Sequence, residues 1–119
     1  MTKKQYLEQI LKETVDGGRV SEVERVYGAE LPEVLKKIIS NNEETIFLDD
    51  GVRILAFKEI LNAKEDLHVD FKADGIIPVA DCGENDFIVY HFKEAFWSKF
   101  NIIDEISFKK EKSIDALMK

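Results

Sequence analysis

The chain has 119 residues and a formal net charge of −7, with 24 Asp and Glu residues against 17 Lys and Arg residues. Its length fits one domain over residues 1–119 that buries a core without help from a metal or a disulfide, and 45% of its residues are hydrophobic. The acidic balance repels phosphate backbones and anionic lipids, so we expect a basic protein partner and neither direct nucleic-acid nor membrane binding. The alternative is that the acidic net charge only keeps the protein soluble.

The compartment follows from three features of the sequence. The opening "MTKKQYLEQ" lacks the apolar core of a signal peptide, and no apolar run is long enough to span a bilayer. The single cysteine, Cys82, cannot form an internal disulfide. We therefore expect the protein in the cytoplasm.

Helices are predicted in the first third of the chain. Apolar residues at helical spacing predict a first helix over residues 4–15, ended by the two glycines of "DGG" at residues 16–18. Ser21, with Glu24 three residues later, matches a capping box at the start of a second helix. Gly28 is expected to end this second helix.

The pattern changes to that of strands after a third predicted helix, which begins at Pro32 and closes at residues 41–42. Asp50-Gly51 lies between two apolar runs, which is a strong hairpin signal because glycine accepts the positive φ of a type I′ turn. Strands are therefore expected near residues 44–48 and 52–56.

Further strands follow along the rest of the chain. A short helix or helical turn is expected over residues 58–68, and a strand over residues 76–80. "DFIVYHF" and "FWSKFNI" predict two more strands, and Ser113 can cap a last helical turn. The order predicts an α+β fold in which N-terminal helices pack against a meandering, mainly antiparallel sheet, followed by a short C-terminal helix.

The segment "DCGEND", residues 81–86, concentrates polar residues between two apolar runs. A structural zinc site needs four Cys or His ligands, whereas the chain has one Cys and two His, and the segment lacks the ligand pattern of a calcium loop. Carboxylate pairs are frequent in so acidic a chain, so this one does not indicate acid/base catalysis. We interpret the segment as a hairpin turn with freedom from Gly83 and Asn85, which can still bind a partner.

Cys82 and His91 could be considered as a nucleophile and its base. An extended strand of nine residues would carry their side chains to opposite faces and opposite ends. A buried thiol for Cys82 and structural roles for His68 and His91 are expected instead. We therefore expect no catalytic residue, no cofactor and no metal, and no enzymatic activity.

Three segments resemble the SUKH superfamily, a group that contains many bacterial immunity proteins and a fungal regulator of cell-wall assembly. They are "VERVYGAELPEVLKKIISNN", the hairpin "TIFLDDGVRILAF" and "GIIPVADCGENDFIVYHF", and the resemblance covers roughly residues 20–110. It implies a non-enzymatic module that binds and neutralises a bacterial toxin, often a nuclease. The alternative is an intracellular regulatory or scaffold protein of the same fold.

The acidic composition fits a partner with a basic surface, because charge complementarity speeds association. Phe96 and Trp97 are neighbours on a predicted strand and point to opposite faces, so Trp97 is either an exposed anchor or part of a core that covers both faces. The candidate partner-binding residues are Asp49, Asp50, Asp81, Glu84, Asp86 and Trp97.

Overall fold

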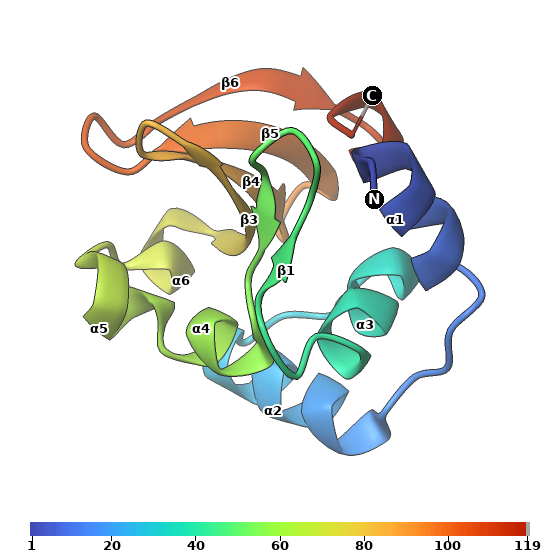
Figure 1. Ribbon diagram of the computed structural model, residues 1–119. Coiled ribbons are helices and arrows are strands. Elements are labelled where there is room, and N and C mark those ends of the chain that lie inside the picture. Colours follow the sequence, from blue (N-terminus) through green and yellow to red (C-terminus); the bar gives the residue numbers. More distant parts are fainter. Residues whose placement is uncertain (119) are drawn as a thin grey trace.

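The computed structural model describes residues 1–118 and shows an α+β fold, as predicted, with a six-stranded antiparallel sheet (Figure 1). The helices are α1 (Lys3–Ile10), α2 (Gly17–Tyr27), α3 (Glu33–Ser40), α4 (Phe57–Leu61), α5 (Ala63–Leu67), α6 (Phe71–Asp74) and the 3-10 turn η1 (Ile114–Ala116). The strands are β1 (Ile46–Phe47), β2 (Arg53–Ile54), β3 (Ile76–Gly83), β4 (Asp86–His91), β5 (Phe96–Asn101) and β6 (Ile106–Glu111).

The sheet is a meander in the order β1-β2-β3-β4-β5-β6, with every neighbouring pair antiparallel. Arg53 of β2 lies opposite Asp81 of β3, and Asp86 of β4 lies opposite Asn101 of β5. Alternate turns of a meander lie at the same end of the sheet. The β1–β2, β3–β4 and β5–β6 turns therefore share one end, which we call the hairpin end and define as residues 48–52, 81–86 and 101–106.

Both faces of β4 and β5 are buried. Phe100 packs against Phe71 of α6 with ring centroids 6.3 Å apart, and Trp97 packs against Tyr90 with centroids 4.9 Å apart. Trp97 and Phe100 are three positions apart on one strand, so their side chains point to opposite faces. Since they are only 3% and 4% exposed, the core covers both sides of the sheet at this point.

The boundary between α1 and α2 differs from the prediction. Helix α1 ends at Ile10, and the glycines at 17–18 begin α2 instead of ending the first helix. Asp16 is the N-cap of α2, and its carboxylate accepts hydrogen bonds from the backbone N–H groups two and three residues later, at 3.0 and 3.2 Å. The cap satisfies N–H groups that would otherwise be unpaired, which offsets the low helix propensity of glycine.

The rest of α2 also corrects one expectation and confirms another. Ser21 lies inside the helix and is not its cap, while Glu24 accepts a hydrogen bond from the backbone N–H of Leu31 at 3.1 Å. Gly28 ends the helix in the left-handed conformation, with φ of 64°, as predicted. Pro32 is the N-cap of α3 and not its first helical residue as predicted, so the helix begins one residue later, at Glu33.

The type I′ geometry predicted for the β1–β2 turn occurs instead in the β3–β4 turn, for which no turn type was predicted. Gly51 has φ of 84°, as predicted, and its N–H donates to the carbonyl of Leu48 at 3.1 Å. Asp50 does not have a positive φ, so the type I′ geometry predicted for this loop is wrong. Glu84 and Asn85 have φ of 54° and 67°, and these two consecutive positive values place the type I′ turn between β3 and β4 instead.

The conformation of Gly51 leads to a prediction with a matched control. A Cβ added at Gly51 or at Gly17 would meet no atom within 4 Å, but only Gly51 has a positive φ. Gly51→Ala should therefore lower the free energy of unfolding by about 1 kcal/mol, whereas Gly17→Ala should leave it unchanged or raise it. Urea denaturation of both variants checks this, and equal midpoints would contradict the turn geometry.

The remaining elements lie close to their predicted places. Residues 58–68 form two short helices, α4 and α5, instead of one, and β1 and β2 are two residues long each. Ser113 caps η1 by accepting a hydrogen bond from the backbone N–H of Asp115 at 3.2 Å. The prediction missed β6, whose residues are largely exposed, and the four-residue helix α6. Within residues 1–118, no helix is long and apolar enough to cross a bilayer.

Candidate functional site

The hairpin end gathers carboxylates from three separate parts of the chain. It holds all five predicted acidic residues and two that the prediction missed. They are Asp49 and Asp50 of the first turn, Asp81, Glu84 and Asp86 of the second, and Asp104 and Glu105 of the third. Strand order, and not sequence proximity, brings them to one end of the sheet.

The two carboxylates of the first turn pair with the start of the chain. Asp49 lies 2.8 Å from the terminal ammonium of Met1, and Asp50 lies 3.1 Å from Nζ of Lys3. Desolvation acts to raise the pKa of Asp50, but the hydrogen bonds from Lys3 and the backbone N–H of Val52 outweigh it and hold the pKa below its usual value. This turn therefore adds little net negative charge to the hairpin end.

Asp81 belongs to a charged network that links the sheet to α4. Its carboxylate lies 3.3 Å from Nε of Arg53, whose Nη1 lies 2.9 Å from the carboxylate of Glu59. Desolvation acts to raise the pKa of Glu59, but hydrogen bonds from Thr45, the backbone of Ala56 and Arg53 hold it below the usual value. Arg53 is thus shared between two carboxylates and fixes β2 against α4.

The depressed pKa of Glu59 predicts a dependence of stability on pH. A carboxyl group with a lower pKa in the folded state stabilises the protein fully above its unfolded value, about 4.3, and loses this contribution as pH falls through the folded value. Glu59→Gln should therefore be less stable than wild type at pH 7, and the difference should shrink between about pH 5 and pH 3. Urea midpoints across this range check it, and parallel curves would contradict the role of Glu59.

The other carboxylates carry the net charge of the hairpin end. Among residues 1–118, no ion pair involves Glu84, Asp86, Asp104 or Glu105. Lys99 of β5 and Lys3 of α1 are both close enough to act on the thiol of Cys82, so two cations lie nearby, of which Lys3 is paired with Asp50. The excess of negative charge therefore lies on the β3–β4 and β5–β6 turns.

Asn101 holds these two turns together. Its Nδ2 donates to the carboxylate of Asp86 at 2.9 Å, and its Oδ1 accepts from the backbone N–H groups of Ile103 and Asp104, both at 3.0 Å. The backbone N–H of Ile102 donates to the carbonyl of Asn85 at 2.9 Å. The two acidic turns are therefore fixed relative to each other.

Trp97 is not part of this surface. It is 3% exposed and packs in the core, so the expectation of an exposed anchor at Trp97 is wrong and the alternative of a two-sided core is correct. Its neighbour Phe96 is half-buried and stacks on His91, with ring centroids 3.9 Å apart. The Trp97 side chain therefore contributes to stability instead of contacting a partner.

Cys82 and His91 lie at opposite ends of the β3–β4 hairpin, since His91 pairs with Ile76 and Cys82 lies next to the turn. Cys82 is half-buried, less so than predicted, and desolvation raises the pKa of its thiol. Nε2 of His91 lies 2.7 Å from Oγ of Ser98, which is fully buried. Within residues 1–118, no group of three or more His, Cys, Asp or Glu side chains is placed to hold a metal ion.

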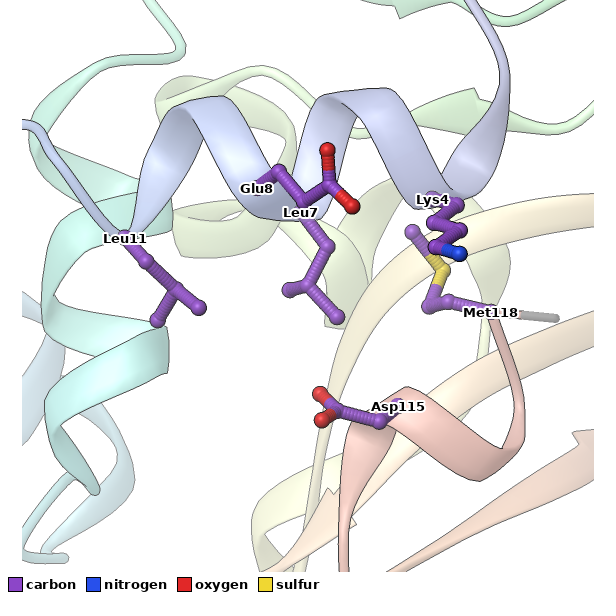
Figure 2. A pocket seen from close by; sticks show the side chains of 6 residues that line it. All are labelled: Lys4, Leu7, Glu8, Leu11, Asp115 and Met118. Atoms are coloured by element: carbon purple, nitrogen blue, oxygen red, sulfur yellow. The ribbon is translucent and has the colours of Figure 1, made fainter.

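A cleft of about 430 Å³ lies between α1 and η1 (Figure 2). Figure 2 shows Leu7 and Leu11 pointing from α1 toward this space and Asp115 facing it from η1. The described lining residues are Lys4, Leu7, Glu8, Leu11, Asp115 and Met118. They include no Ser, Thr, Cys or His side chain, and three of the six are apolar.

The sequence contained a signal for the two missed carboxylates. "NIIDEI", residues 101–106, has an Asn whose side chain can hydrogen-bond the backbone two and three residues later, which is typical of a turn. Three isoleucines in this segment give it the appearance of a continuing strand. The turn is therefore recognisable only from Asn101 and the Asp-Glu pair.

Comparison of the chain with protein-family models, with curated proteins and with solved structures found no match.

Proposed function

We propose that this protein is a cytoplasmic immunity protein that binds a bacterial toxin with a basic working surface, such as a nuclease, and neutralises it by covering that surface. The observation that carries the proposal is the excess, within residues 1–118, of carboxylates outside any ion pair on two turns that Asn101 holds in a fixed arrangement. The resemblance of three sequence segments to the SUKH superfamily supports it. Neutralisation by coverage requires no chemistry from this chain.

Physical reasoning connects this surface to fast binding. The active face of a nuclease must attract phosphate, so it is rich in Lys and Arg and attracts Glu84, Asp104 and Glu105 in the same way. Unpaired carboxylates steer the two proteins together and raise the association rate. Turns already fixed in the free protein add little ordering cost on binding.

A growth assay tests the proposal with the product of the gene beside this one in its native genome, which the proposal requires to be a toxin. The C-terminal domain of that product is expressed in a bacterial reporter strain with and without this protein. We expect wild-type protein to restore growth and to form a complex with the domain that co-purifies. Failure to protect or to bind would overturn the proposal and favour a regulatory or scaffold role.

A further inference from the structure

The β5–β6 turn exposes large apolar side chains that a solvent-facing turn does not need. Ile103 is 70% exposed and Ile106 is 59% exposed, and both flank the carboxylates of Asp104 and Glu105. Turns of this kind usually consist of Gly, Asn, Asp, Ser and Pro. Isolated exposed apolar residues are ordinary, but Ile103 in the turn and Ile106, the first residue of β6, lie three positions apart with two acidic residues between them.

The turn holds these isoleucines in a defined position. The side chain of Asn101 accepts hydrogen bonds from the backbone N–H groups of Ile103 and Asp104, and the N–H of Glu105 donates to the Asn101 carbonyl at 2.8 Å. Ile102 packs against the core, which anchors the base of the turn. Ile103 is therefore presented by a tied backbone and not by a free loop.

We infer that Ile103 and Ile106 form the apolar anchor of the partner-binding surface, and that the partner is a protein with an apolar pocket bordered by Lys and Arg. This inference rests on the proposed function and specifies its contact. Apolar residues that are desolvated at the centre of an interface supply most of its binding energy, while the surrounding charges supply orientation and speed.

The negative charge of the hairpin end favours a basic protein over two other binding partners, a second copy of this chain and an anionic membrane. A second copy of this chain would bring the same carboxylates of Glu84, Asp104 and Glu105 against themselves, and its net charge is also −7. An anionic membrane surface would repel the turn for the same reason. A basic protein surface is attracted by the rim and can bury the isoleucines.

The experiment compares Ile103→Ser/Ile106→Ser with the matched control Val15→Ser/Val26→Ser, which changes two other exposed apolar residues, on the α1–α2 connection and on α2. The probe is the C-terminal domain of the neighbouring gene's product that the growth assay uses. We expect the anchor variant to raise the dissociation rate at least about tenfold while its association rate and melting temperature stay near wild type. The control variant should bind like wild type.

The outcomes separate the inference from the proposed function. If the wild type binds and the two double variants dissociate at equal rates, Ile103 and Ile106 are not the anchor of the interface, and the proposed function still stands. Absence of binding by wild type would overturn both. Concentration-dependent self-association that the anchor variant abolishes would identify a second copy as the occupant and also overturn the inference. A photo-cross-linking residue at position 103, compared with one at position 26, should capture the toxin domain only at position 103.

Discussion

Trp97→Ala should lower the free energy of unfolding by about 3–5 kcal/mol, because it removes a large buried side chain and leaves a cavity beside Tyr90. The indole is 3% exposed and lies on the face of β5 opposite Phe100, so the surrounding strands cannot collapse freely into the space. Chemical denaturation of the wild type and the variant measures the difference.

The control for this prediction is Phe47→Ala. Phe47 is 75% exposed on β1, so its removal should change the free energy of unfolding by no more than about 0.5 kcal/mol. A loss at Trp97 no larger than that at Phe47 would show that Trp97 is not in the core.

Asn42→Asp should cost about 3 kcal/mol or more at pH 7, although the two side chains have nearly the same shape. Asn42 is fully buried, and its Nδ2 donates to the carbonyl of Leu55 at 2.6 Å. Its Oδ1 is also buried and finds no donor within residues 1–118. The substitution therefore replaces the side-chain amide group that donates this hydrogen bond with a second oxygen. It also places a negative charge on a carboxylate whose two oxygens are both shielded from water.

The pH dependence of this variant provides its own control. Burial raises the pKa of the new carboxyl group in the folded state above its pKa in the unfolded state. The loss of folding free energy is therefore complete at pH values above the folded-state pKa. It becomes smaller as the pH falls from the folded-state pKa toward the unfolded-state pKa. The difference between variant and wild type should therefore shrink between pH 7 and pH 4. Urea midpoints measured on both proteins at each pH check this, and a constant difference would argue against a buried charge.

Local patterns in the sequence predicted most of the fold. Gly28 ends a helix and Gly51 turns a hairpin because each adopts a positive φ that the sequence marks with glycine. The same rule failed at residues 17–18, where Asp16 made two glycines the start of a helix. The β3–β4 turn shows a further limit, since Glu84 adopts a positive φ that its identity does not announce.

The candidate site was less predictable than the fold, because it depends on which turns share an end of the sheet. Asp81, Glu84 and Asp86 were recognised as one turn, but their neighbours Asp104 and Glu105 are adjacent only through the β4–β5 and β5–β6 pairings. The pairing of Asp50 with Lys3 also joins residues far apart in sequence. Which carboxylates remain unpaired is therefore a property of the tertiary structure.

The measurement that tests the central claim most directly is the association rate, at low and high salt, with the C-terminal domain of the neighbouring gene's product that the growth assay uses. It compares wild type with Glu84→Gln/Asp104→Asn/Glu105→Gln, which removes three exposed charges of the hairpin end. The matched control is Glu30→Gln/Glu65→Gln/Asp66→Asn, which removes three exposed charges near α2 and on α5.

We expect wild-type and control association to be fast at low salt and to slow steeply as salt screens the charges. The hairpin-end variant should associate about tenfold more slowly at low salt, depend less on salt and melt at the same temperature. Equal association rates for the two triple variants would contradict the claim that this acidic end of the sheet recognises the partner.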